Sequence, residues 1–235
     1  MGKGFDEYAS AYDAWFLDNR NVLYSEANLV ASTLKDAVRI LSVGCGSGLF
    51  EKILRDEYGI TITDGIEPST GMAEIARKRG MNVTIATAED ADFGNGVYDT
   101  ILFNGTPSYI TDLASVVAKA FAALPAGGRI VLIDVPKESS YGIMYNLAKA
   151  LGTWQHPLLE SVYPPNPYPI EFVNVANWRT TAEKISLLEN AGFVNLKAAQ
   201  TLTSHPLYSD MAEEQPIEGY GKGDYVAVTA FKPAD

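Results

Sequence analysis

The stretch Arg39-Ile-Leu-Ser-Val-Gly-Cys-Gly-Ser-Gly-Leu-Phe50 decides the fold of this chain. An apolar run typical of a buried strand is followed by glycines at 44, 46 and 48 and then by the start of a helical pattern. Glycine permits positive φ, removes the side chains that would hold a backbone away from a ligand, and leaves bare amides for the ligand's polar end. The stretch therefore predicts a strand, a ligand-cradling turn and a helix.

Strand and helix patterns alternate on the carboxyl side of this turn. Apolar residues recur every three or four positions in the helical segments, and Gly59 and Gly80 end two of them. The predicted helices are 49–58, 69–79 and 111–123, and the predicted strands are 60–66, 83–85, 97–103 and 129–135. Repeated strand-helix units imply a mainly parallel sheet covered on both faces.

The segment 136–180 breaks this alternation, because it is rich in aromatic residues and has five prolines between 157 and 169. It is predicted to be an insertion that caps the carboxyl edge of the sheet and shapes an acceptor pocket, or alternatively a dimer surface. Regular structure returns with Thr180-Thr-Ala-Glu183, a capping-box pattern that begins a helix. The last two strands, 193–201 and 224–232, are joined by a polar loop without a crossover helix, which predicts an antiparallel hairpin.

The composition excludes several classes of protein. The 235 residues are 47% hydrophobic and 20% charged, as expected of one globular domain. A net charge of −11 argues against nucleic acid or an anionic membrane as a partner and favours a small molecule. One cysteine allows no internal disulfide, no signal sequence is evident, and no apolar run is long enough to span a bilayer. We expect a cytoplasmic protein that is a monomer or a homodimer.

The order of the motifs resembles that of the class I S-adenosylmethionine (SAM)-dependent methyltransferases, in the small-molecule branch similar to methyltransferase types 11 and 25. The resemblance runs from about residue 5 to 232. Besides the glycine loop, it rests on Phe5-Asp-Glu-Tyr-Ala-Ser-Ala-Tyr-Asp-Ala-Trp-Phe16, Asp64-Gly-Ile-Glu-Pro-Ser-Thr-Gly-Met72, Ala88-Glu-Asp-Ala-Asp-Phe93, Tyr98-Asp99 and Leu124-Pro-Ala-Gly-Gly-Arg-Ile-Val131.

The resemblance implies an α/β fold with a Rossmann-like, seven-stranded sheet. This sheet would be mostly parallel, with an antiparallel C-terminal hairpin and helices on both faces. A single methyltransferase domain would span residues 1–235, with an N-terminal helical lid over about 5–36 and a substrate cap over about 136–180.

Ligands of open parallel sheets bind outside the carboxyl ends of the strands, where the chain order reverses. Gly44, Gly46 and Gly48 are therefore expected to lie against the methionine part of SAM, unless the turn serves only strand-helix packing. Cys45 lies in the same loop and is expected beside the cofactor as a small packing residue, not a nucleophile. Glu67 ends the second strand, where a carboxylate can accept hydrogen bonds from both ribose hydroxyls.

The resemblance adds further cofactor contacts. Pro68, Ser69 and Met72 would line the adenosine. Ala88 and Glu89 would bind adenine, although the family often has aspartate where this chain has Thr87, and a plain surface loop is the alternative. Asn104 and Gly105 would lie below the methyl-donor centre.

The aromatic residues have two readings each. Tyr12 and Trp15 share one face of a predicted helix and are either ordinary core or a lid that closes over SAM, where aromatic faces favour a sulfonium cation. Tyr109 faces the substrate or packs on the following helix. The residues expected to contact substrate are Tyr109, Tyr141, Tyr145 and Trp154.

Methyl transfer from a sulfonium is an in-line displacement that requires positioning and exclusion of water rather than a covalent enzyme intermediate. No metal-ligand set is visible in the sequence, and no metal is expected. His156 is the one named candidate for a general base, with a loop histidine without a catalytic role as the alternative.

The sequence thus predicts a SAM-dependent methyltransferase of a small molecule, with S-adenosylhomocysteine (SAH) as the other product. A binding protein of the same fold that retains SAM without turnover is the alternative. An NAD-dependent oxidoreductase is disfavoured, because its G-x-G-x-x-G fingerprint needs glycine where this chain has Leu49.

Overall fold

The computed structural model describes residues 11–234, and its centre is one mixed sheet with the strand order β3-β2-β1-β4-β5-β8-β6-β7. β1 to β5 are parallel, and β6, β7 and β8 run antiparallel to their neighbours. The strands are β1 (Ile40–Val43), β2 (Asp64–Ile66), β3 (Asn82–Thr84), β4 (Thr100–Asn104), β5 (Arg129–Asp134), β6 (Val194–Thr201), β7 (Ile217–Glu218) and β8 (Tyr225–Phe231).

The Rossmann-like fold class and the antiparallel end of the sheet are confirmed, but the expected number of seven strands is wrong. The eighth strand, β7, is a two-residue strand inside the polar loop between β6 and β8, where Ile217 pairs with Gln200. A strand of two residues is too short to show the alternation of apolar and polar residues that identifies a strand in a sequence. β2 is also shorter than expected, because it begins at Asp64 instead of residue 60.

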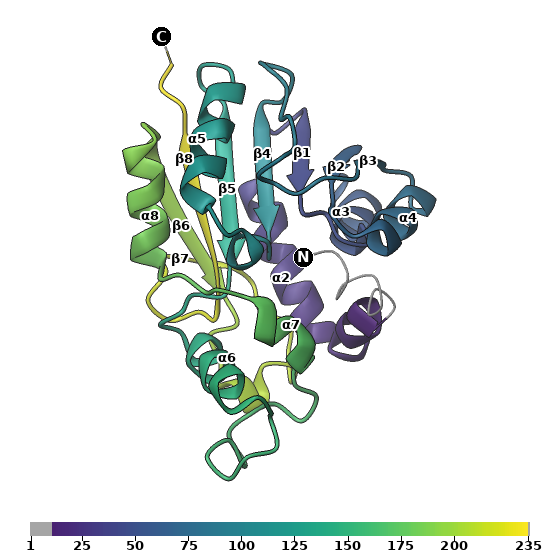
Figure 1. Ribbon diagram of the computed structural model, residues 1–235, viewed down its shortest axis with the longest axis vertical. Coiled ribbons are helices and arrows are strands. Elements are labelled where there is room, and N and C mark those ends of the chain that lie inside the picture. The colour runs from purple at the N-terminus through teal and green to yellow at the C-terminus, as the bar shows by residue number, and fades with distance from the viewer. Residues whose placement is uncertain (1–10, 235) are drawn as a thin grey trace.

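Helices cover both faces of the sheet (Figure 1). They are α2 (Arg20–Thr33), α3 (Leu49–Tyr58), α4 (Thr70–Lys78), α5 (Leu113–Ala123), α6 (Ser140–Leu151), α7 (Ile170–Val175) and α8 (Thr181–Asn190), with short 3-10 turns at Pro107–Tyr109 and Pro206–Tyr208. Residues 11–18 form a further helical segment before α2. Among residues 11–234, no helix has the length and apolar character to cross a membrane.

Alternation along the buried strands builds two cores. Leu41, Ile101 and Phe103 pack with α5 and α8 on one face, whereas Ile40 and Leu102 pack with α2 and α3 on the other. α3 begins after the glycine loop and ends at Gly59, and α8 begins with the predicted capping box between Thr180 and Glu183. Both are the ends that the sequence predicts.

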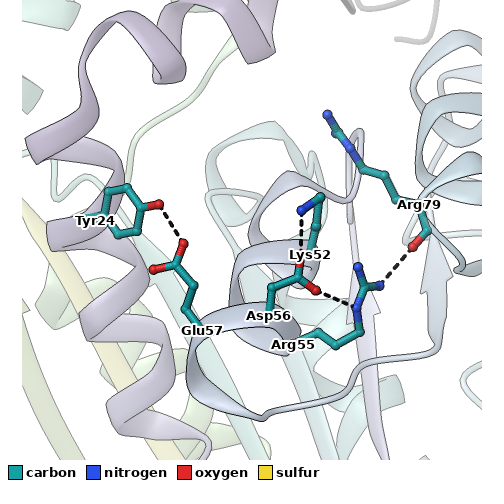
Figure 2. A network of polar contacts seen from close by, with 6 residues as sticks. All are labelled: Tyr24, Lys52, Arg55, Asp56, Glu57 and Arg79. Atoms are coloured by element: carbon teal, nitrogen blue, oxygen red, sulfur yellow. Dashed lines mark hydrogen bonds and ion pairs between the residues drawn. The ribbon is translucent and has the colours of Figure 1, made fainter.

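Polar contacts tie α3 to α2 and to the end of α4 (Figure 2). Tyr24 of α2 donates a hydrogen bond to Glu57 of α3, and Arg55 of α3 donates to the Arg79 carbonyl just after α4. The Arg79 guanidinium points away from this network in Figure 2. It is therefore free for the contact with the glycine loop described below.

The insertion between β5 and α8 forms a third core of its own. α6 and α7 lie beyond the carboxyl ends of β4 and β5 (Figure 1), and the insertion buries Tyr141, Tyr145, Trp154 and Trp178. Within the described part of 136–180 there is no strand. This placement puts an aromatic-rich unit over the edge of the sheet where the chain order reverses.

Candidate functional site

A cavity opens at the carboxyl ends of β1, β2, β4 and β5, between the sheet and the insertion. Thirteen of the residues singled out in the sequence line it, together with several that were not. The lining residues are Tyr12, Trp15, Phe16, Glu26, Gly44, Gly46, Ile66, Glu67, Pro68, Met72, Thr87, Ala88, Glu89, Asn104, Gly105, Thr106, Ser108, Tyr109, Ile110, Asp134, Val135, Tyr145, Tyr168, Trp178 and Tyr225.

Two of the three loop glycines face this cavity. Gly44 has φ +73°, and a Cβ there would lie 2.4 Å from Thr106 Cγ2, so only glycine lets the β1 and β4 loops meet. Gly46 has φ +55°, and a Cβ there would meet no atom within 4 Å, so this residue borders open space. A flat or bulky ligand can approach the backbone at Gly46.

Gly48 has a different role from the one expected. A Cβ at Gly48 would lie 2.9 Å from Met81 Sδ and 3.2 Å from Ala76 Cβ, and the residue does not line the cavity. Its positive φ of +72° turns the chain into α3. The third glycine therefore serves the packing of α3 against α4, and the expectation that it lies against the ligand is corrected.

The loop amides are also less bare than expected. The amides of Gly44 and Cys45 both donate to the Ile66 carbonyl, at 2.7 and 3.1 Å, and the Gly46 amide donates to Glu67 at 2.9 Å. These hydrogen bonds close the β1 loop onto the end of β2. The backbone amides of these three residues are therefore already bonded within the protein, and the loop can accommodate a ligand by its shape rather than by donating from these amides.

Glu67 joins the two strand ends that border the cavity. Its side chain is buried, with Oε2 accepting from the Gly46 amide and Oε1 accepting from the Ser69 amide at 2.8 Å. Backbone hydrogen bonds fix the carboxylate at the lip of the cavity, where Pro68 and Met72 also lie.

The loop after β3 also contributes residues to the wall of the cavity. Ala88 and Glu89 line the cavity, and Lys119 of α5 holds their carbonyls at 2.9 and 2.5 Å. Glu89 accepts a hydrogen bond from the Thr111 amide at 3.0 Å. The carboxylate of Glu89 is therefore directed toward the start of α5, while the loop backbone remains at the cavity.

The end of β4 places an oriented amide below the middle of the cavity. The Tyr225 hydroxyl donates to Asn104 Oδ1 at 2.8 Å, which leaves the Asn104 amide nitrogen as the free donor end of that side chain. Burial raises the pKa of Tyr225 well above its ordinary value, so the hydroxyl keeps its proton. Gly105 follows, and a Cβ there would lie 3.2 Å from the same hydroxyl.

The helical segment 11–18 and the insertion form the roof. Trp15 Nε1 donates to the Asn166 carbonyl at 3.1 Å, and the Trp15 ring meets Tyr168 edge to face at 5.1 Å. Tyr12 makes a similar contact with Phe172 of α7, at 6.0 Å. The predicted lid and the predicted cap thus contact each other.

A set of polar contacts, here called the latch, joins the helical segment 11–18 of the roof to the glycine loop. Asp13 forms an ion pair with Arg79 at 2.6 Å and accepts a hydrogen bond from the Ser47 hydroxyl, and Arg79 also donates to the Ser47 carbonyl at 2.8 Å. By contrast, α2 packs in the core under the sheet. Of the segment 5–36 predicted as a lid, residues 11–18 lie over the cavity, residues 20–33 do not, and 5–10 lie outside the described residues.

Two buried carboxylates line the opposite side from Glu67. Glu26 of α2 and Asp134 at the end of β5 are 7% and 3% exposed. Burial raises the pKa of both carboxyls, and the charge of Asp134 raises the pKa of Glu26 further. No lysine, arginine or histidine lies among the lining residues.

Five other predicted site residues lie outside the cavity lining. Cys45 is buried, and burial raises the pKa of its thiol far above the range of a nucleophile, whereas Ser69 caps α4 by accepting from the Met72 amide. In the insertion, Tyr141 bonds Ser209, Trp154 Nε1 donates to the Tyr168 carbonyl, and His156 Nδ1 accepts from the Leu158 amide. These three residues build the cap, and the structure places His156 away from the site.

The sequence did not identify Glu26, Asp134 and Tyr225, which also line the cavity. Asp134 had a usable signal, because it ends an apolar strand just as Glu67 does. Glu26 and Tyr225 had none, since a glutamate in a helix and a tyrosine in a strand are ordinary residues until the fold brings them together.

Comparison with known proteins gives a consistent result. The profile of the methyltransferase domain family matches residues 16–198. An uncharacterised protein of Methanocaldococcus jannaschii is 31% identical over 97% of this chain and 98% of its own. A malonyl-[acyl-carrier protein] O-methyltransferase of Acetivibrio thermocellus is 30% identical over 53% of this chain and 45% of its own.

A crystal structure from Thermotoga maritima is similar over the whole chain. It is described as a SAM-dependent methyltransferase and a possible histamine N-methyltransferase. It has a TM-score of 0.82 and 31% identity, and the match covers 99% of this chain and 100% of the other.

Proposed function

The chain belongs to the SAM-dependent methyltransferases, and we propose that it transfers the methyl group of SAM to a small molecule held between Asn104 and the aromatic roof. The observation that carries this proposal is the composition of a single cavity. One side offers the open backbone at Gly46 and the fixed carboxylate of Glu67, and the other offers aromatic rings and two buried carboxylates. One half suits the cofactor, and the other suits an acceptor.

The residues of the first half fit SAM. Glu67 would accept the ribose hydroxyls, Gly46 would admit the chain of the methionine part, and Met72 and Ala88 would pack on the adenine. The cofactor supplies an electrophilic methyl group on a cationic sulfur. The rings of Tyr12 and Trp15 lie where their faces would favour that charge.

The protein's contribution is to position the acceptor and exclude water. The roof formed by 11–18 and the insertion covers the cavity, and the Asn104 amide is held by Tyr225 from below. Holding the reacting groups in line at near-attack distance and excluding water both lower the barrier to such a displacement. We propose that 11–18 acts as the lid and 136–180 as the substrate cap of one domain.

The relatives' names suggest different acceptors. The match to malonyl-[acyl-carrier protein] O-methyltransferase covers about half of this chain, so it supports the shared cofactor more than a shared acceptor. The relative described as a possible histamine N-methyltransferase matches across the whole chain, cap included. An amine acceptor therefore agrees better with the likeness.

The test is product formation. Purified protein with SAM and a panel of amines, phenols and carboxylates is assayed for SAH and for methylated product by mass spectrometry. We expect SAH to form with at least one acceptor and not without protein. Tight SAM binding with no SAH formed from any acceptor would favour the alternative of a non-catalytic SAM-binding protein.

A further inference from the structure

Every charged residue that lines the cavity is acidic: Glu26, Glu67, Glu89 and Asp134. Glu67 and Glu89 have backbone amide donors at the cofactor side. Glu26 and Asp134 come from α2 and β5, on the acceptor side, and the cofactor contacts proposed above do not use them.

Glu26 is a buried carboxylate without a partner among residues 11–234. It is 7% exposed, and only burial and the charge of Asp134 act on its pKa, with no hydrogen bond contributing. Its neighbours on the buried face of α2 include Leu23, Ala27 and Val30, which provide no donor. An unpaired buried carboxyl is costly, and a fold retains one chiefly where a ligand will pair with it.

Asp134 is placed differently. Its Oδ1 accepts from the Val135 amide at 2.8 Å, Ser108 also donates to it, and the buried ammonium of Lys184 lies behind it and lowers its pKa. The Lys184 Nζ has no hydrogen-bond partner among the described residues. Hydrogen-bond donors and a neighbouring cation thus favour the ionised form of Asp134, whereas burial and the charge of Asp134 raise the pKa of Glu26 and favour its protonated form.

Aromatic rings line the same cavity as the pair. The rings of Tyr145 and Trp178 are tilted to each other with centres 5.0 Å apart, and both line the cavity. The charge of Glu26 also contributes to the raised pKa values of Tyr12, Tyr141, Tyr145 and Tyr225. Aromatic faces next to carboxylates form a pocket for an organic cation.

We propose that Glu26 and Asp134 form the acceptor-binding pair of this cavity and that the acceptor is a small aromatic amine, which the pair binds and relieves of one proton. This inference rests on the proposed function and names its substrate class. On binding, Glu26 releases its own proton to solvent, and the ammonium nitrogen, held between the two carboxyls, then transfers a proton to the Glu26 carboxylate and keeps the lone pair that a methyl acceptor needs. The titratable or polar groups that interact with Glu26 are Tyr12, Tyr141, Tyr145, Tyr225 and Asp134, and those that interact with Asp134 are Tyr109, Tyr225, Lys184 and Ser108.

Proton counting gives this proposal a readout that does not depend on turnover. Because burial favours the protonated form of Glu26 and the amine enters from water as an ammonium, we expect the complex to hold one proton fewer than the separate partners, whether that proton is on the carboxyl or on the amine. Binding should therefore release about one proton to the buffer at neutral pH. Calorimetry in phosphate and in Tris, which differ in ionisation enthalpy, measures that number.

The experiment uses protein saturated with SAH, so that no reaction occurs. Benzylamine, 2-phenylethylamine and histamine are titrated beside benzyl alcohol and 2-phenylethanol as uncharged matches. The variants are Glu26→Gln, Asp134→Asn and, as a matched control of the same charge change, Glu74→Gln on the exposed face of α4. SAH and SAM affinities are measured for each variant first.

We expect at least one amine to bind the wild type about tenfold or more tightly than its alcohol, with proton release. Glu26→Gln should remove both the preference and the proton release and leave SAM affinity unchanged, while Glu74→Gln should change none of them. Asp134→Asn should also weaken amine binding. If Glu26→Gln folds poorly, this second variant tests the pair in its place.

Three results would overturn the inference. If no amine binds better than its alcohol, the acceptor is not an amine. If Glu26→Gln weakens SAM and amine equally, the carboxyl serves the cofactor. If Glu26→Gln retains the amine preference, the pair is not the site. Failure of the wild type to bind SAM or SAH would instead refute the proposed function itself.

Discussion

At the scale of the residue, Glu67 does more than follow β2 directly in the chain. It accepts from the Gly46 and Ser69 amides and so connects the β1 loop to the β2 loop. A strand-end carboxylate was predictable from the apolar run before it, because parallel strands point their carboxyl ends at the ligand. The backbone amides that donate to Glu67 could not be predicted, since they depend on how the two loops meet in space.

Replacing Glu67 with alanine should weaken SAM binding by about 1 to 3 kcal/mol, because charge-assisted hydrogen bonds to the ribose are lost. Thermal stability should fall too, since the Gly46 amide loses its acceptor. Calorimetric titration with SAM measures the first effect and a melting curve the second. Glu74→Gln is the control, and an unchanged SAM affinity in a folded Glu67→Ala protein would reject the ribose role.

Asp224 provides a residue-scale prediction about pH. Burial raises the pKa of this carboxyl to about 6, although it accepts from the Tyr141 amide at 2.8 Å. Between the ordinary pKa of aspartate and about 6, the folded state keeps a proton that the unfolded state releases. Raising the pH through this window therefore favours unfolding, by up to about 1.4 kcal/mol per pH unit.

The variant Asp224→Asn isolates this effect. Wild type should lose stability relative to the variant as the pH rises from about 4 to about 6, and the difference should then level off. Urea unfolding of both proteins at several pH values measures it. A constant difference across the window would show that the folded-state pKa of Asp224 is not raised.

At the scale of the element, helix ends were easier to predict than short strands. Gly59 and the Thr180 capping box each end or begin a helix through local chemistry, which a sequence displays directly. β7 exists because Ala199 and Gln200 of β6 offer it an edge, and that information is not local. The division of the predicted lid has the same cause: α2 is core because β6 and β8 lie beneath it.

The latch between 11–18 and the glycine loop predicts a coupling between the roof and cofactor retention. The side chains of Asp13 and Arg79 are 13% and 21% exposed, and Asp13→Asn removes the ion pair between them. This variant should weaken SAM binding by about 0.5 to 1.5 kcal/mol, chiefly because SAM is released faster. Stopped-flow fluorescence of Trp15 and calorimetry measure the release rate and the affinity.

A double-mutant cycle tests whether Asp13 and Arg79 act together. The effect of the double variant should be smaller than the sum of the effects of Asp13→Asn and Arg79→Ala, because the two side chains share an ion pair, although each also contacts Ser47. Lys52→Ala, which removes the exposed pair with Asp56 seen in Figure 2, is the control and should leave SAM release unchanged. Additive effects of Asp13 and Arg79 would contradict the latch.

At the scale of the whole molecule, the sheet could be predicted from the sequence, but one part of the cavity wall could not. The mainly parallel sheet and its antiparallel C-terminal end could be predicted from the alternation of elements and from a resemblance that spans nearly the whole chain, because alternating strands and helices permit few topologies. The acceptor side could not, since it gathers Glu26, Asp134, Tyr145 and Tyr225 from four separate elements. Their meeting is a property of the assembled fold.

The measurement that tests the central claim most directly is calorimetric titration of the purified protein with SAM, SAH and NADH. The account predicts that both adenosyl ligands bind, that NADH does not, and that saturating SAM raises the melting temperature, since a ligand at about 100 times its Kd stabilises the fold by about 2.7 kcal/mol. Binding of NADH with no binding of SAM or SAH would contradict it, because the glycine loop and Glu67 would then serve a different cofactor.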